Sequence, residues 1–310
     1  MTIQELQQRQ QWPLYQKIDH ALGTVEAFMA RIGKVPYVSF SGGKDSTVLL
    51  DLIRRFLKPD IKAVFCNTGN EFPEIVKFVR RTENVTVIRP EMTVRQVLDK
   101  YGFPLISKEQ SSYIREAKTT HNEKLRNRRL YGEKGKSGFR GTISARWRFL
   151  VNAHFDVSEK CCECLKKRPF RKYEKETGEL PILGVMAVES DQRTHQYIRR
   201  GGCNSFDGKR PTSNPLSIWT DADIWAYLKE FKVPYCELYD KGADRTGCMF
   251  CGFGAHIEKT SRFARLRKLH PKAYGIFMNY TNNGVTYREA LNRIGVQLPD
   301  GPRQLDLFEG

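Results

Sequence analysis

The chain has 310 residues, of which 40% are hydrophobic and 11% aromatic, enough to build a buried core in one large domain or two small ones. Its 52 lysines and arginines exceed its 35 aspartates and glutamates, which gives a formal net charge of +17. This excess of positive charge favours polyanionic partners, nucleic acid above all. The alternative is a basic protein without such a partner. No apolar run approaches the roughly 20 residues of a membrane span. The polar, Gln-rich segment 1–17 is not typical of a signal peptide, so we expect a cytoplasmic protein.

Helical and strand patterns alternate along the first hundred residues. A leading amphipathic helix is expected over 14–31. Strands are then expected over 35–40, 61–66 and 85–88, and helices over 47–57, 73–81 and 93–100. A later strand over 182–188 is expected to rejoin the same sheet. This alternation predicts an α/β, Rossmann-like fold with a parallel sheet and helices on both faces.

The sequence predicts a division of the whole chain into four segments. We expect an N-terminal helix in 1–33, a nucleotide domain over 34–256, a helical region over 257–300 and a flexible tail over 301–310. Helices are predicted over 222–231 and over most of 259–272.

A basic insertion of about 108–158 interrupts the predicted domain. Between residues 115 and 148 there are eleven Lys or Arg and three Glu, interleaved with aromatic residues and glycines. Basic residues mixed with aromatics suit phosphate contact plus base stacking. The alternative is a solvated helix and loop with a few core aromatics. The candidate nucleic-acid contacts are Arg126, Arg128, Arg129, Lys134, Lys136 and Arg140.

A glycine-rich turn joins the first expected strand to the next helix. Backbone N–H groups of such a turn and of the helix N-terminus point at phosphate oxygens. Gly42 and Gly43 permit the tight turn, and Lys44 adds positive charge. The hydroxyls of Ser41 and Ser46 add donors. The neighbouring Asp45 would repel phosphate unless it holds Mg²⁺.

The six residues 41–46, Ser-Gly-Gly-Lys-Asp-Ser, resemble the PP-loop of the ATP pyrophosphatase (adenine nucleotide alpha hydrolase) superfamily. The segment 66–74 resembles the second nucleotide motif of the phosphoadenosine-phosphosulfate-reductase-like branch, with Asn67 where Asp is usual. The segment 184–193 resembles the third motif, with Met186 in place of a frequent Arg. The segment after it, 214–231, also matches, so the resemblance covers about 30–256.

This resemblance implies an adenine-nucleotide site and its residues. It implies ATP and Mg²⁺ as cosubstrate and cofactor, and catalytic roles for Lys44, Asp45 and Arg193. The nucleotide-binding residues that it implies, besides 41–46, are Thr68, Gly69, Glu189 and Ser190.

Eight cysteines include two clusters, which in a reduced compartment suggest metal binding before disulfides. The pair Cys161 and Cys162 lies upstream of Cys248 and Cys251, and these four are the preferred ligands. The spacing of the cysteines alone does not distinguish a zinc site from an iron–sulfur cluster. Resemblance to the site of adenylylsulfate reductases favours a [4Fe–4S] cluster. Cys164 and Cys203 stay alternative ligands.

The last residues carry a separate motif. The sequence 304–308, Gln-Leu-Asp-Leu-Phe, resembles the peptide that docks on the bacterial DNA sliding clamp. Its expected anchors are Gln304, Leu305, Leu307 and Phe308, and the alternative is a tail whose apolar residues fold back on the core.

Two chemistries occur in this branch. The intact loop 41–46 is typical of ATP-cleaving members, and no cysteine follows Cys251 to serve as the thiol nucleophile of the reductases. We therefore expect an ATP-dependent, pyrophosphate-releasing sulfur transferase acting on nucleic acid, DNA before tRNA, with a sulfur donor such as a cysteine desulfurase. The alternatives are a reductase of adenylyl or phosphoadenylyl sulfate and a non-catalytic DNA-bound module that senses ATP or redox state.

Overall fold

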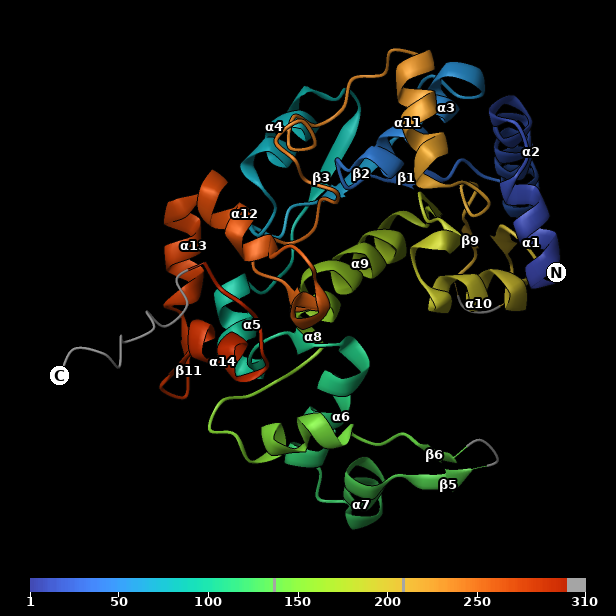
Figure 1. Cartoon of the computed structure of the whole chain (residues 1–310). Coiled ribbons are helices and arrows are strands. Elements are labelled where there is room, and N and C mark those ends of the chain that lie inside the picture. Colours follow the sequence, from blue (N-terminus) through green and yellow to red (C-terminus); the bar gives the residue numbers. More distant parts are fainter. Residues whose placement is uncertain (136–137, 208–209, 300–310) are drawn as a thin grey trace. The chain divides into compact units, whose positions relative to one another are not determined.

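The computed structural model describes residues 1–135, 138–207 and 210–299, and the chain folds into two compact units (Figure 1). Unit 1 comprises 1–67, 71–89 and 169–246, and unit 2 comprises 68–70, 90–168 and the chain from 247 onward. The segment 34–256 therefore contributes to both units. Within the described residues, no helix has the length and apolar character needed to cross a membrane.

Unit 1 is built on a six-stranded sheet with the order β3-β2-β1-β7-β9-β8. The strands pair in parallel except for β8 and β9, which pair antiparallel. Their bounds are β1 Tyr37–Ser39, β2 Ala63–Cys66, β3 Val85–Ile88, β7 Pro181–Leu183, β8 Asn204–Ser205 and β9 Thr212–Ser213. The α/β, Rossmann-like fold class predicted from the alternating pattern is thereby confirmed.

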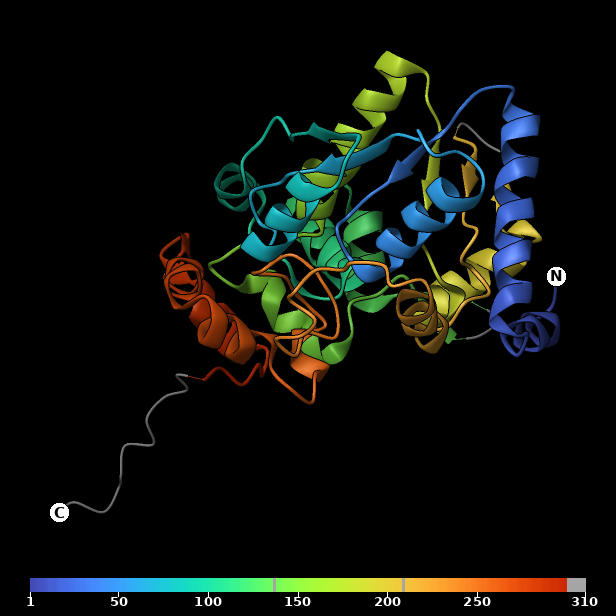
Figure 2. The same ribbon diagram turned by 90° about the horizontal axis from the view of Figure 1, so that it is seen from above.

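Helices cover both faces of this sheet, as the handedness of the crossovers requires. The connections from β1 to β2 and from β2 to β3 run in one direction along the sheet, and right-handed crossovers put their helices on one face. The connection to β7 runs in the other direction, so its helix lies on the opposite face (Figure 2). The helices of unit 1 are α1 Ile3–Gln10, α2 Leu14–Ile32, α3 Lys44–Phe56, α4 Pro73–Arg81, α9 Arg168–Thr177, α10 Asp191–Arg200 and α11 Asp221–Glu230.

An aromatic cluster fixes α9 on its face of the sheet. Tyr37 of β1 and Val64 of β2 are fully buried and pack with Tyr173 of α9. The rings of Tyr37 and Tyr173 meet edge to face, with centroids 5.3 Å apart. Such ring pairs add about 0.5–1.5 kcal/mol beyond the burial of their area. The Tyr37 hydroxyl also donates to Glu174 at 2.6 Å, so the polar end of the buried ring is satisfied.

Unit 2 consists of short elements around a buried tyrosine. The Tyr287 hydroxyl donates to the backbone oxygen of Phe250 at 2.7 Å, and the rings of Phe103, Phe250 and Phe263 surround the Tyr287 ring. The helices of unit 2 are α5 Val94–Tyr101, α6 Lys108–Thr119, α7 Glu123–Tyr131, α8 Lys160–Cys162, α12 Arg262–Leu269, α13 Pro271–Met278 and α14 Tyr287–Arg293. Its strands are β4 Leu105–Ile106, β5 Glu133–Gly135, β6 Gly138–Arg140, β10 Gly252–Phe253, β11 Thr281–Asn282 and β12 Val285–Thr286.

The elements predicted over 14–100 and 222–231 match the structure to within a few residues, whereas later predictions differ, and the region 257–300 contains the β11–β12 hairpin besides its helices. Helix α4 and strand β3 have the predicted bounds. The strand expected over 182–188 ends at Leu183, and 187–189 forms a short 3-10 turn, η3 Ala187–Glu189. The helix expected over 259–272 is two helices, because α12 ends at Leu269 and α13 starts at Pro271. Proline lacks the N–H that a continuous helix would need there and is well placed as a first helical residue.

Candidate nucleotide site and cysteine pocket

The candidate nucleotide loop follows the central strand of unit 1. Strand β1 lies between β2 and β7, so the chain leaves it at the point where the strand order reverses. Ligands of open α/β sheets bind outside the carboxyl ends of the strands at such a switch point. The turn 40–43 lies there and leads into α3, whose first residue is Lys44. The fold therefore presents the N-terminus of α3 where an anion is expected.

Two glycines shape this turn for different reasons. Gly42 has a φ of +71°, which L side chains rarely adopt, and a Cβ there would lie 3.0 Å from methyl groups of Ile75 and Val79. Gly43 has an extended backbone, but a Cβ there would lie 2.5 Å from the Thr246 hydroxyl. Position 42 requires glycine because of its positive φ and because a side chain would not fit. Position 43 requires glycine only because a side chain would not fit.

Hydroxyl groups hold the turn closed. The Ser46 hydroxyl donates to the backbone oxygen of Gly43 at 2.9 Å and accepts from the backbone nitrogen of Ser41 at 3.1 Å. The Ser41 hydroxyl lies 3.0 Å from the Ser46 hydroxyl and accepts from the Gly43 nitrogen at 3.3 Å. The two serines predicted to contact phosphate therefore also preorganise the loop.

Tyr239 and Thr246 complete the loop and were not predicted from the sequence. The Tyr239 hydroxyl accepts a hydrogen bond of 2.9 Å from the backbone nitrogen of Lys44, 195 positions away in the chain. The hydroxyls of Tyr239 and Thr246 lie 3.3 Å apart. Burial raises the pKa of Tyr239, so its hydroxyl keeps its proton. No local motif marks either residue, because both reach the loop through the tertiary fold.

The charged residues of the loop form a compact group. The Lys44 ammonium lies 3.1 Å from the Asp45 carboxylate and 2.6 Å from that of Asp221. Burial raises the pKa of Asp45, and the adjacent Lys44 charge opposes this shift. Asp221, on the first turn of α11, is a further acidic neighbour that the sequence did not indicate. A carboxylate so close to a phosphate turn suits a divalent cation, because Mg²⁺ prefers oxygen ligands and bridges to phosphates.

The third predicted motif packs against the start of α3. A Cβ at Gly184 would lie 3.1 Å from the backbone oxygen of Asp45, so β7 and α3 approach closely there. Ser190 caps α10 by accepting from the backbone nitrogen of Arg193 at 3.3 Å. The Arg193 guanidinium pairs with Glu189. The negative charge of Glu189 is among the influences that raise the pKa of Asp45, which puts this motif within electrostatic reach of the loop.

The second predicted motif is divided between the two units. Asn67 ends a segment of unit 1, whereas Thr68 and Gly69 belong to unit 2. Thr68 is buried and its hydroxyl accepts from the backbone nitrogen of Asn70 at 3.3 Å. Gly69 has a φ of +77°. The roles predicted for Thr68 and Gly69 in nucleotide binding stay predictions.

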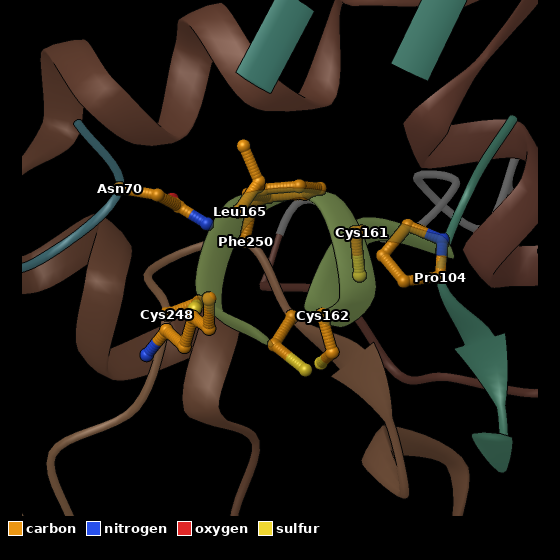
Figure 3. A pocket seen from close by; sticks show the side chains of 9 residues that line it. Asn70, Pro104, Cys161, Cys162, Leu165, Cys248 and Phe250 are labelled. Carbon is orange, nitrogen blue, oxygen red and sulfur yellow. The ribbon is translucent and has the colours of Figure 1, made fainter. Parts of the chain in front are cut away.

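The four preferred cysteines line one pocket in unit 2. Cys161 and Cys162 come from α8, while Cys248 and Cys251 flank the turn before β10 (Figure 3). The other lining residues are Asn70, Pro104, Leu165, Lys166 and Phe250. The backbone nitrogen of Met249 donates to the Asn70 oxygen at 2.9 Å, which joins the Cys248 turn to the segment 68–70. The tertiary fold therefore brings together two clusters that lie far apart in the sequence.

The donor set of this pocket fits a thiophilic group. A hydrogen bond from Cys161 lowers the pKa of Cys162, and Lys108 and Lys166 act in the same direction. The same contact raises the pKa of Cys161. In the part of the chain that the structure describes, neither polar atom of the buried Asn70 side chain has a partner. A buried amide without a partner costs free energy, which a polar group in the pocket would recover.

The thiols surround the pocket without converging on one point. Over the described ranges 1–135, 138–207 and 210–299, no three His, Cys, Asp or Glu side chains are grouped so as to hold a metal ion. The alternative ligands differ from the four. Cys164 is buried and packs with Val97 and Leu165. Cys203 belongs to unit 1, and burial raises its pKa to about 11.

The basic insertion contains both buried and exposed aromatics. Trp147 is buried and meets His256 edge to face, while Tyr131 is 64% exposed. Arg126 and Arg128 are exposed, and Arg129 is bound to Glu116 at 2.7 Å. The structure describes only the backbone of Lys134 and Arg140, and Lys136 lies outside the described residues, as do Gln304, Leu305, Leu307 and Phe308.

A comparison with protein-family models decides the family. The model of the phosphoadenosine phosphosulfate reductase domain matches residues 35–252. The chain belongs to this family. The membership confirms the resemblance inferred from the loop 41–46 and the later motifs, and it covers the strands and helices that carry the candidate nucleotide site.

Individual relatives agree with the family. An uncharacterised protein of Methanocaldococcus jannaschii is 30% identical over 236 residues, which are 75% of this chain and 39% of that protein. Adenosine 5′-phosphosulfate reductase of a Geobacillus strain is 28% identical over 214 residues, 68% of this chain and 70% of that enzyme. The chain thus spans less than half the length of the first of these relatives.

A solved structure resembles the chain more remotely. The phosphoadenylyl-sulfate reductase of Candida auris, in a phosphate complex, superposes with a TM-score of 0.42 at 18% identity. The match covers 74% of this chain and 93% of that one.

Proposed function

We propose that the loop 41–46 binds the phosphates of an adenine nucleotide and that the chain catalyses a sulfur reaction in which AMP is the leaving group. The observation that carries this proposal is the turn between β1 and α3 at the switch point of the parallel sheet. The hydroxyls around Gly43 and the Lys44 ammonium supply donors for phosphate oxygens. The family membership supports a nucleotide that carries sulfur or activates an acceptor for it.

Reduction of adenylyl sulfate is the reaction that the relatives favour, because enzymes of that name align with 68% of this chain. In this reaction a thiolate attacks the sulfur of the sulfate group and AMP leaves. A second thiol then attacks the resulting thiosulfonate, so that a disulfide forms and sulfite is released. The thiols are oxidised and the sulfur is reduced by two electrons. Here the loop would hold the AMP phosphate, and an external dithiol would supply the electrons.

ATP-dependent sulfur transfer is the second candidate, and the group Lys44, Asp45 and Asp221 favours it. A carboxylate within a phosphate turn suits Mg²⁺, and Mg²⁺ suits a polyphosphate more than a single phosphate. An acceptor oxygen would attack the α-phosphorus and pyrophosphate would leave. The persulfide sulfur of a donor such as a cysteine desulfurase would then displace AMP, and an external thiol would cleave the resulting disulfide, so that the thiolated acceptor is released and the thiols are oxidised. Electrostatic stabilisation by Lys44 would act on the departing pyrophosphate.

The cysteine pocket would serve either reaction. Cys161, Cys162, Cys248 and Cys251 would hold a [4Fe–4S] cluster, because each iron takes one thiolate and the four sulfurs need not meet at one point. Zinc stays the alternative and would require the thiols to move to about 2.3 Å from one centre. When bound, a cluster would supply redox capacity beside the chain's own donors. The Asn70 amide and the Lys166 ammonium would face it.

One experiment separates the candidates. The protein is purified without oxygen and given either ATP with Mg²⁺ or adenylyl sulfate with a dithiol, with DNA, tRNA or no polymer, and pyrophosphate and sulfite are measured. Sulfite release identifies the reductase, and polymer-dependent pyrophosphate release identifies the transferase. The isosteric variant Asp45→Asn sharpens the result: it should abolish pyrophosphate release but leave sulfite release within a few-fold. Nucleotide binding with neither product would identify a sensing module and overturn both reactions.

A further inference from the structure

Helix α7 is unusual because none of its nine residues is buried. A helix with no fully buried residue gains little free energy from packing, since helices in proteins owe most of their stability to an apolar face. Figure 1 shows α7 beside α6, followed directly by the β5–β6 hairpin. Folding of unit 2 therefore accounts for how α7 is attached, but not for the composition of its outer side.

Arg129 attaches α7 to its neighbours. Its guanidinium pairs with Glu116 of α6 at 2.7 Å, donates to the Gly141 oxygen at 2.9 Å and lies over the Tyr113 ring at 4.1 Å. The backbone oxygen of Arg129 accepts from the Ile143 nitrogen at 2.7 Å. Arg129 and the half-buried Leu125, four residues earlier, thus define the side of α7 that faces the rest of unit 2.

A neighbouring side of α7, about 100° around the helix axis from Leu125 and Arg129, carries two cations and an aromatic ring. Lys124, Arg128 and Tyr131 are all exposed and follow the i, i+4, i+7 spacing that puts residues on one helical face. Like charges at i, i+4 destabilise a helix, so the placing of Lys124 and Arg128 is a cost to folding. A surface pair of Arg128 with Glu133 at 3.4 Å offsets little of it, because both side chains are about half exposed or more.

We propose that this face of α7 binds single-stranded nucleic acid. Lys124 and Arg128 would contact successive phosphates, and the ring of Tyr131, a residue that is 64% exposed, would stack on an unpaired base. The three side chains extend over about 10 Å of helix, since each residue rises 1.5 Å. The net charge of +17 gives the complementary attraction for a polyanion. The inference is independent of the reaction at the loop 41–46, because α7 lies in unit 2 and the loop in unit 1.

The test measures binding of labelled oligothymidylate and oligouridylate of about 16 nucleotides, and of a duplex of the same length, across a salt series. Lys124→Ala/Arg128→Ala should lower the slope of log K against log salt by about 1.4, since each single-strand phosphate contact contributes about 0.7. Tyr131→Ala should weaken single-strand binding about tenfold at every salt concentration without changing that slope. Comparison of the affinities for oligothymidylate and oligouridylate shows whether this face prefers single-stranded DNA or single-stranded RNA.

A matched control removes two positive charges elsewhere in unit 2. Lys268 and Lys272 are also exposed and also four residues apart, so Lys268→Ala/Lys272→Ala has the same charge change. The proposal expects this control to bind like the wild type. An equal loss of slope in the control would show attraction by net charge alone and overturn the proposal. Equal affinity for duplex and single strand, or an unchanged affinity in Tyr131→Ala, would also overturn it. In Tyr131→Trp, fluorescence quenching on binding the single strand would report the stacking directly.

Discussion

The hydroxyl of Tyr239 lies 2.9 Å from the backbone nitrogen of Lys44 and accepts its hydrogen bond. The Lys44 nitrogen is one of the first N–H groups of α3, which have no partner within the helix. A side chain 195 positions away in sequence therefore satisfies a donor that the proposed function assigns to a phosphate. Tyrosine and phosphate would compete for the same N–H group.

This competition predicts the behaviour of Tyr239→Phe. The variant leaves the Lys44 nitrogen without its acceptor, which should cost about 1 kcal/mol in the free energy of unfolding of the nucleotide-free protein. A phosphate would take over the donor in both proteins, so the loss should disappear at saturating nucleotide. Binding of nucleotide should accordingly tighten about fivefold. Unfolding curves with and without ATP and Mg²⁺ measure both quantities. An equal destabilisation with and without nucleotide would contradict the competition.

The two glycines of the loop should respond differently to alanine. Gly43→Ala puts a Cβ 2.5 Å from the Thr246 hydroxyl and should cost about 1–3 kcal/mol through overpacking. Adding Thr246→Ala removes that hydroxyl and should restore most of the stability. Gly42→Ala should not be rescued, because its φ of +71° is itself unfavourable for alanine. Chemical unfolding of the four proteins gives a double-mutant cycle, and a zero coupling between positions 43 and 246 would refute the predicted clash.

The sequence predicted the loop 41–46 because consecutive residues carry its chemistry: the turn, the donors and the helix start are all local. It did not predict Tyr239, Thr246 or Asp221, which reach the loop only through packing of unit 1. No periodicity or spacing marks them, since each is an ordinary residue of a loop or of a first helical turn. Local patterns likewise missed the break between α12 and α13 although Pro271 stood in the predicted helix.

The cysteines illustrate the same limit on a smaller scale. Spacing identified the two clusters, but it left Cys164 as a possible replacement for either Cys161 or Cys162. A π-helical turn, η2 Glu163–Lys167, directly follows α8 and changes the direction in which the next side chains point. Cys164 is buried beside Val97, whereas Cys161 and Cys162 line the pocket, and Cys161 also packs against the cluster that holds Cys164. A change of helical register cannot be read from residue spacing.

Stability should depend on pH through His20, a half-buried residue whose ring meets Trp12 edge to face. Burial lowers the pKa of His20 in the folded protein, so the unfolded state binds its proton more readily. The free energy of unfolding should therefore be unaffected by His20 above about pH 6.5, and should fall as the pH drops below that value. His20→Gln should flatten this part of the profile, measured by urea unfolding between neutral and mildly acidic pH. His121→Gln, which removes an exposed imidazole, is the control; an equal flattening there would argue against the burial effect.

The iron content of serine variants should distinguish the four pocket cysteines from Cys164. Cys162→Ser removes a thiol that lines the pocket and should remove most of the iron from protein purified without oxygen. Cys164→Ser should retain the iron, because its thiol packs in the apolar cluster with Val97 and Leu165. The latter variant should instead lose about 1 kcal/mol of stability from burial of a hydroxyl. Loss of iron from Cys164→Ser with retention in Cys162→Ser would reverse the assignment, and zinc in place of iron in the wild type would exclude the cluster.

The side chain of Asn70 should tune the group that the pocket holds. It is 1% exposed and lines the pocket, and within the described residues its amide has no hydrogen-bond partner. An amide N–H that donates to cluster sulfur stabilises the reduced, more negative state and raises the reduction potential. Asn70→Leu keeps the branched shape and the number of side-chain heavy atoms but removes the donor, so the potential should fall while the iron content stays near that of the wild type. Asn70→Gln, which retains an amide, should fall less. Redox titration followed by visible absorbance measures the shift, and an unchanged potential in Asn70→Leu would show that the amide faces no cluster sulfur.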